Sequence, residues 1–212
     1  MEKVKLVKFA ALTLRGKERG VGLQWSIRKG FPRITVYTGN YLKEDKTVDY
    51  DKIIIAPFDY TTMLMFLENF KSIIYHKDDT VSSSIKCFNT KFVDNKRTDD
   101  IILQATATVG KKDGIIYLSA TADGKPVHKF ELVPEGKWHK YFNNEEELTN
   151  KAQLSRQYAK AYYELLKTIL LQEFFLDTKQ ELEIDSPLFE SSLIKNVTPD
   201  ENKKITEDTL FD

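Results

Sequence analysis

Apolar and polar residues alternate with a period of two along much of the chain, which is the pattern of half-buried β-strands. In the first half this alternation predicts strands at residues 23–28 and 33–37. Residues 4–14 are also strand-like, and the short continuous apolar run at 52–56 indicates a further strand. A helix is expected next, with Asp59 as its N-cap, because apolar residues then recur every three or four positions. The residues that should form its buried face are Met63, Phe66, Leu67, Phe70 and Ile74.

The second half repeats this order of elements. Alternation and Asp-Gly turns predict strands at residues 85–93, 101–109, 116–120 and 127–133. A helical pattern follows over about residues 150–175. Its far end is apolar almost all round, so it should be buried either between two sheets of this chain or against another subunit. The expected core positions of the second of these strands and of the helix are Ile101, Leu103, Ala105, Ala107, Val109, Leu154, Tyr158, Ala161, Tyr162, Leu165, Ile169 and Leu170.

These patterns predict an α+β fold. Two β-β-β-β-α repeats, at about residues 1–76 and 82–176, should form two antiparallel sheets packed with helices, and together make one domain. Residues 177–212 are polar and acidic without sustained periodicity, so we expect a mostly disordered tail there.

The zero net charge of the chain conceals two oppositely charged ends. Residues 1–40 carry nine Lys and Arg against two acids, whereas residues 173–212 carry eleven acids against four Lys. The acidic end finishes on Leu210, Phe211 and Asp212. A basic body followed by an acidic tail with an aromatic tip is expected of a nucleic-acid binder that carries its own docking peptide. The alternative interpretation is a solvated surface with a frayed terminus.

Composition disfavours several classes of protein. The chain has neither an apolar run near the ~20 residues of a membrane span nor a signal-peptide pattern. We therefore expect a protein of the cytoplasm, the host cytoplasm if the protein is viral. A lone Cys87 suits a reducing compartment. Neither a metal nor another cofactor is expected, because no metal-ligand spacing links Cys87 and the three histidines, which are His76, His128 and His139.

One motif leaves an enzyme open. Glu135 and Lys137 fit the Glu-x-Lys half of a restriction-type nuclease site, in which Asp113 or Asp123 would share Mg²⁺. Such a motif arises easily by chance in a chain that is 30% charged, and it also suits a turn after a strand. We expect no enzymatic activity, with a Mg²⁺-dependent nuclease as the alternative.

The strand faces opposite the expected core are rich in cations, hydroxyls and amides, with a few aromatics and scarcely any acid. Single-stranded nucleic acid requires this mixture, because Lys and Arg neutralise phosphates and aromatic rings stack on bases. Trp25 shares the register of Leu23 and Ile27, so it is assigned to the core. The predicted binding residues are Lys5, Arg15, Lys17, Arg19, Arg28, Lys29, Phe31, Arg33, Tyr37, Lys111, Lys112 and Tyr117.

The doubled element order, with basic hairpins and a long apolar helix, resembles the Whirly and positive-cofactor superfamily of single-stranded-DNA-binding proteins. The segments that carry the resemblance are residues 11–17 (ALTLRGK), 25–28 (WSIR) and 34–37 (ITVY). Among these proteins the chain is most similar to those of bacteriophages. The resemblance implies two sheets packed at an angle, helices in the core of an oligomer, and DNA across the sheets.

The tail adds a second likeness. Replicative single-stranded-DNA-binding proteins tend to end in an acidic peptide with a terminal aromatic, and residues 207–212 are similar to this. We therefore expect a DNA-binding protein, likewise of a bacteriophage, that coats and protects single strands in replication or recombination. Leu210, Phe211 and Asp212 should dock partner proteins. A transcriptional or RNA-binding relative is the alternative within this class.

Overall fold

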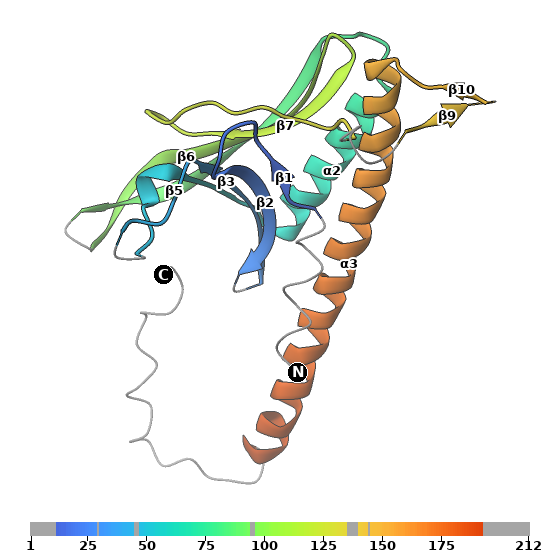
Figure 1. Cartoon of the computed structure of the whole chain (residues 1–212). Coiled ribbons are helices and arrows are strands. Elements are labelled where there is room, and N and C mark those ends of the chain that lie inside the picture. Colours follow the sequence, from blue (N-terminus) through green and yellow to red (C-terminus); the bar gives the residue numbers. More distant parts are fainter. Residues whose placement is uncertain are drawn as a thin grey trace. The chain divides into compact units, whose positions relative to one another are not determined.

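A computed structural model of the protein describes residues 12–28, 30–44, 47–93, 96–134, 140–143 and 145–192. The chain divides into two compact units, Met1–Leu170 and Leu171–Asp212. The described part of the first unit contains two antiparallel four-stranded sheets, an α-helix and the start of a second (Figure 1). The predicted α+β class and the two antiparallel sheets are confirmed, and each four-stranded sheet is followed along the chain by a helix.

The first sheet has the order β1-β2-β3-β4, with β1 at Leu14–Arg15, β2 at Val21–Arg28, β3 at Phe31–Thr38 and β4 at Ile53–Pro57. A 3-10 turn, η2 at Tyr50–Lys52, leads into β4. The predicted alternation is confirmed in β2 and β3, because their core positions pair across the sheet and are fully buried. These positions are Leu23, Trp25, Ile34 and Val36.

Helix α2, Tyr60–Tyr75, begins as predicted at Asp59. The Asp59 carboxylate accepts a 2.7 Å hydrogen bond from the backbone N–H of Thr62, which satisfies one of the free donors at the helix start. The backbone hydrogen bond holds the pKa of this carboxyl below its usual range. All five predicted core residues of the helix are buried, together with Ile73.

The second sheet has the order β5-β6-β7-β8, with β5 at Val81–Val93, β6 at Lys96–Lys112, β7 at Ile115–Thr121 and β8 at Phe130–Glu131. The predicted Asp-Gly turn between β6 and β7 is confirmed. Asp113 and Gly114 both have positive φ, 51° and 76°, as a two-residue hairpin turn requires. The last strand is shorter than predicted.

Two core positions predicted on β6 are wrong. Ile101 and Leu103 are 72% and 47% exposed, whereas Ala105 and Ala107 are fully buried. The cause is a β-bulge: Cys87 pairs with Ala105 but the next residue, Phe88, pairs with Leu103, so β6 holds one extra residue. A bulge reverses the alternation beyond it, and sequence periodicity does not reveal it.

A small hairpin that the sequence did not predict, β9 at Phe142–Asn143 and β10 at Glu146–Glu147, precedes the last helix. Helix α3 covers Lys151–Ser192 and passes from the first unit into the second (Figure 1). The predicted end near residue 175 is wrong, and residues 177–192 are helical rather than irregular. Lys, Gln, Glu and Leu are frequent just after residue 177, and these residues favour a helix without any apolar periodicity. Residues 193–212 lie outside the described part.

The start of α3 packs on the core through a face that differs in part from the predicted one. Tyr158 and Leu165 are 36% and 44% exposed. Ala, Tyr and Leu stand on more than one side of this part of the helix, so its sequence does not say which face is buried. The buried positions up to Leu170 are Ser155, Ala159, Tyr162, Tyr163, Leu166, Ile169 and Leu170.

Candidate nucleic-acid interface

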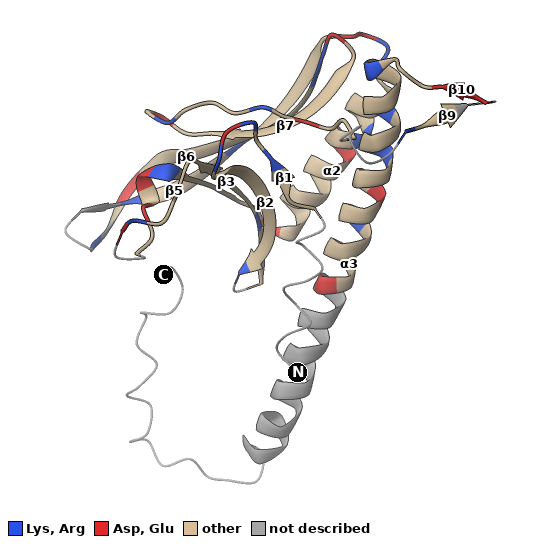
Figure 2. Cartoon of the chain, viewed as in Figure 1, with Lys and Arg blue, Asp and Glu red and all other residues tan. Residues whose placement is uncertain are grey.

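The face of the first sheet that points away from the core, here called the outer face, is built from alternate residues of β1, β2 and β3. Neither β2 nor β3 contains an acidic residue, and both are free of red in Figure 2. Cross-strand pairing brings Ser26 opposite Arg33, and Arg28 opposite Phe31. The side chains of the outer face on these strands are Arg15, Gln24, Ser26, Arg28, Phe31, Arg33, Thr35 and Tyr37.

Two hydrogen bonds hold polar side chains of the outer face in position. The Nε of Arg33 donates to Oγ of Ser26 at 3.0 Å, and the hydroxyl of Tyr37 donates to Oε1 of Gln24 at 3.1 Å. Gly22 lies opposite Tyr37 in the pairing of β2 with β3. Because these bonds restrict the side chains before any ligand arrives, less conformational entropy is lost when a ligand binds.

The electrostatics of the outer face favour an anion. Burial, and then the positive charge of Arg28, lower the pKa of Arg33. Arginine stays charged even so, and two neighbouring guanidinium groups repel each other. A phosphate between them would replace this repulsion with attraction. Burial, and then Tyr41, raise the pKa of Tyr37, so its hydroxyl remains a hydrogen-bond donor.

Tyr37 is less open to a base than the sequence suggested. Its ring lies 4.4 Å from the ring of Tyr41, centroid to centroid, with the two planes tilted by 35°. Tyr41 therefore covers one face of Tyr37. Sequence reasoning missed Tyr41 because it follows the strand, where no alternation assigns it to a face.

A groove lies where the β2–β3 turn of the first sheet meets β5 of the second. It has a volume of about 270 Å³. Phe31 and Phe88, both among its lining residues, are 52% and 58% exposed, and Lys86 is exposed. Its acidic residue, Asp59, already accepts hydrogen bonds from Thr62. The groove thus combines two accessible aromatic rings with a cation.

Lys86 and Phe88 were missed at the sequence level. The predicted strand at 85–93 gave no clear assignment of its faces, because Lys, Cys and Phe follow one another without strict alternation. The pairing with β6 resolves it: Lys86 lies opposite Thr106, and Phe88 follows on the same face. Ser84 and Thr108, also on this face, share a 2.8 Å hydrogen bond.

The structure does not leave Tyr117 or Lys111 on an accessible face. Tyr117 is 8% exposed, packs against Gly110, and has the Nζ of Lys129 4.6 Å from its ring centroid. Lys111 is 7% exposed, and its Nζ donates to the carbonyl oxygen of His76 at 2.8 Å. Burial, and then Arg156, lower the pKa of Lys111. Tyr117 and Lys111 are therefore buried in contacts that stabilise the fold, whereas Lys112 is exposed.

The remaining predicted residues fall into two groups. Arg15, Lys17 and Arg19 are exposed on β1 and on the turn that follows it. The residues outside the described part are Lys5, Lys29, Leu210, Phe211 and Asp212.

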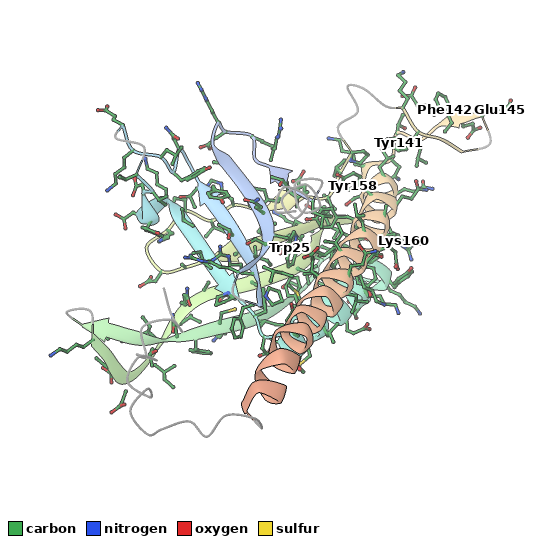
Figure 3. All side chains as sticks on the ribbon, turned by 90° about the horizontal axis from the view of Figure 1, so that it is seen from below. Trp25, Tyr141, Phe142, Glu145, Tyr158 and Lys160 are labelled. Atoms are coloured by element: carbon green, nitrogen blue, oxygen red, sulfur yellow. The ribbon has the colours of Figure 1, made fainter. Side chains whose placement is uncertain are left out.

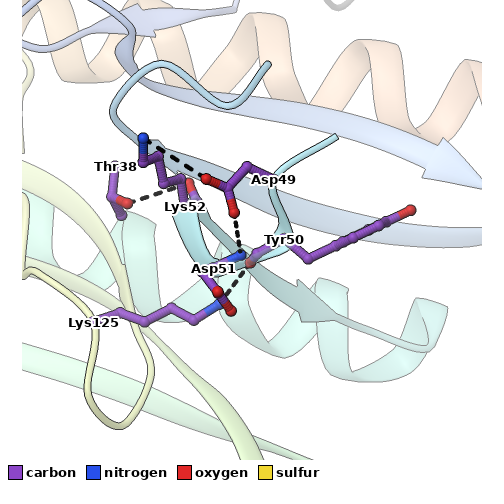
Figure 4. A network of polar contacts seen from close by, with 6 residues as sticks. All are labelled: Thr38, Asp49, Tyr50, Asp51, Lys52 and Lys125. Atoms are coloured by element: carbon purple, nitrogen blue, oxygen red, sulfur yellow. Dashed lines mark hydrogen bonds and ion pairs between the residues drawn. The ribbon is translucent and has the colours of Figure 1, made fainter. Parts of the chain in front are cut away.

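A polar cluster fixes the two sheets next to this interface (Figure 4). Nζ of Lys125, from the β7–β8 connection, donates to the carbonyl oxygens of Tyr50 and Ile53 at 2.9 and 2.7 Å. The hydroxyl of Thr38, at the end of β3, donates to the carbonyl oxygen of Lys52 in η2. Lys125 thus joins the second sheet to the start of β4. Its ammonium group is engaged in hydrogen bonds that stabilise the fold.

The candidate nuclease residues gain no support. Glu135, Lys137 and His139 lie outside the described residues. Asp113 and Asp123, of which one was expected to share Mg²⁺ with Glu135, flank opposite ends of β7, and this pairing stays a prediction. No group of three metal-ligating side chains occurs in the described ranges.

No helix in the described ranges is long and apolar enough to cross a membrane. Comparison with family models, curated proteins and solved structures finds no match to this chain. The likeness to the Whirly and positive-cofactor superfamily therefore stays a prediction.

Proposed function

We propose that this protein binds single-stranded nucleic acid, with single-stranded DNA as its ligand. The observation that carries the proposal is the continuity of an acid-free, guanidinium-bearing outer face on β2 and β3 with a groove edged by two half-exposed phenylalanines. Phosphates would lie against Arg15, Arg28 and Arg33. Bases would stack on Phe31 and Phe88 beside Lys86.

The proposal favours a single strand over a duplex for a physical reason. In a duplex the base faces are stacked on one another, so aromatic side chains do not reach them without unstacking. A single strand exposes these faces, and stacking on an aromatic side chain contributes about 1–3 kcal/mol per base. The exposure of Phe31 and Phe88 next to cations suits this mode of binding.

The role we propose is to coat and protect single strands during replication or recombination, as in a bacteriophage. Residues 207–212, with Leu210 and Phe211, would dock partner proteins. Several copies would associate along the strand.

A salt titration of binding to fluorescent oligo(dT) tests the proposal. Wild-type affinity should fall steeply with salt, because each neutralised phosphate of a single strand adds about 0.7 to the slope of log K against log salt. The double variant Arg28→Gln, Arg33→Gln should bind less tightly, by about 1 kcal/mol per arginine, whatever the base sequence of the oligonucleotide. Its slope of log K against log salt should also be smaller than that of wild type.

Arg156→Gln is the matched control, because Arg156 is exposed on α3, away from the outer face. It should bind like wild type. Absence of binding, or an affinity that does not change with salt concentration, would overturn the proposal. Oligo(U) of equal length tests the RNA-binding alternative: clearly tighter binding than oligo(dT) would replace DNA with RNA as the ligand.

A further inference from the structure

A second cavity, here called the junction pocket, lies between the β1–β2 turn and β8. Its volume is about 270 Å³. The first sheet contributes Arg15 and Lys17 to its lining, and the second contributes His128 and Lys129. The pocket is thus formed by both sheets, and sequence reasoning had assigned no role to His128.

The charges around the junction pocket suit an anion. Three cations line it against two carboxylates, Glu18 and Glu131. Among the residues that the structure describes, neither carboxylate forms an ion pair with these three cations. Lys129 lies over the ring of Tyr117, which restricts its ammonium group to this region.

His128 supplies an independent observation. Its Nε2 is buried and has no hydrogen-bond partner among the described residues. A buried polar atom without a partner costs about 1–3 kcal/mol. Because Nε2 is closed to solvent, the His128 ring must turn before a ligand in the pocket can accept its hydrogen bond and recover this cost. The ring packs against Phe130, with the centroids 6.5 Å apart, so it has a neighbour that limits its orientation.

We propose that the junction pocket binds one phosphate group of the nucleic-acid strand, with Arg15, Lys17 and Lys129 as its cations and His128 as a hydrogen-bond donor. The inference rests on the proposed function and extends it to the second sheet. The volume of the pocket, about 270 Å³, is enough for one phosphate group with water.

The path of the strand follows from this assignment. Arg15 pairs with Gly22 on β2, and Gly22 pairs with Tyr37 on β3, so the pocket adjoins the outer face. A strand that crosses the outer face would therefore continue past the β1–β2 turn to the second sheet. Two cationic stretches of the chain, far apart in sequence, would contact one ligand.

Lys129→Gln and His128→Ala test the pocket, with Lys71→Gln as the control that removes one exposed charge from α2. In oligo(dT) titrations Lys129→Gln should lower the salt slope by about 0.7, and Lys71→Gln should leave it unchanged. His128→Ala should weaken binding about fivefold with the slope retained, and His128→Gln, which keeps an amide donor, should restore most of it. Equal behaviour of Lys129→Gln, His128→Ala and the control overturns the inference while leaving the proposed function intact.

NMR of the His128 ring in the full chain separates the two sources of phosphate. Saturable shifts with inorganic phosphate, absent in Lys129→Gln, support the pocket even if oligo(dT) does not bind, in which case the proposed function fails alone. If the His128 signals shift with oligo(dT) but not with inorganic phosphate, the pocket binds a phosphodiester of the DNA, which the other contacts of the DNA hold in place. No shift with either ligand overturns the inference.

Discussion

The indole Nε1 of Trp25 donates a 2.8 Å hydrogen bond to the hydroxyl of Tyr162, which connects β2 with α3 across the core. The same hydroxyl donates to the carbonyl oxygen of Leu12, also at 2.8 Å. Burial raises the pKa of Tyr162, so the hydroxyl stays protonated and can both accept and donate. One tyrosine thus satisfies two buried groups that are 137 and 150 residues away from it in the chain.

Tyr162→Phe should lower the free energy of unfolding by about 2–4 kcal/mol, because the substitution leaves the Trp25 N–H and the Leu12 carbonyl without a partner. Urea unfolding followed by circular dichroism measures the change. Tyr50→Phe is the matched control, because the side chain of Tyr50 is 68% exposed, and it should stay within about 0.5 kcal/mol of wild type. A Tyr162→Phe protein as stable as the control would contradict the reading of this bond.

Gly110→Ala should also destabilise the fold. A Cβ at position 110 would lie 2.5 Å from the hydroxyl oxygen of Tyr117 and 2.6 Å from its Cζ, so the ring must move. Overpacking of this kind costs about 1–3 kcal/mol.

The double variant Gly110→Ala, Tyr117→Ser separates this cause from strain in the strand. If the clash with the ring is responsible, the alanine should cost much less in the Tyr117→Ser background, as measured by thermal unfolding. An equal cost in both backgrounds would point to the backbone of β6 instead.

Much of this fold was predictable because strand alternation is a local property. Leu23, Trp25, Ile34 and Val36 reach the core as expected, since each strand of the first sheet has one buried face along its length. The bulge beside Cys87 was not predictable, because it depends on which β6 residue the partner strand meets.

The candidate site shows the same division. The sequence predicted Arg28, Phe31 and Arg33, which stand on clearly alternating strands. It missed Lys86 and Phe88, whose face is set by pairing with β6. It also misjudged Tyr117, because burial of an outward ring by a neighbouring lysine is a tertiary effect.

Phe31→Ala and Phe88→Ala should each weaken binding of oligo(dT) by about 1–3 kcal/mol, the range for loss of one base-stacking contact. The salt slope should stay at the wild-type value, because no charge is removed. This combination distinguishes stacking from phosphate contact in the same titration.

Phe142→Ala provides the control for these two variants. Phe142 is 62% exposed on the β9–β10 hairpin, apart from the groove (Figure 3). The variant should bind like wild type. If Phe142→Ala weakens binding as much as Phe31→Ala does, the oligonucleotide does not bind specifically in the groove.

Stability should fall at alkaline pH through Cys87. Burial raises the pKa of the Cys87 thiol to about 11, whereas an unfolded thiol titrates near a pKa of about 8.5. The folded state thus favours the neutral thiol. The stabilisation that results is complete below about pH 8.5 and is lost as the pH rises towards 11.

Between pH 7 and pH 10 the free energy of unfolding should decrease by about 2 kcal/mol from this group alone. Cys87→Ala removes the titrating group and keeps the other ionisable residues, so urea unfolding of both proteins at the two pH values isolates the effect. Equal losses of stability in wild type and Cys87→Ala would show that the thiol is not held neutral by the fold.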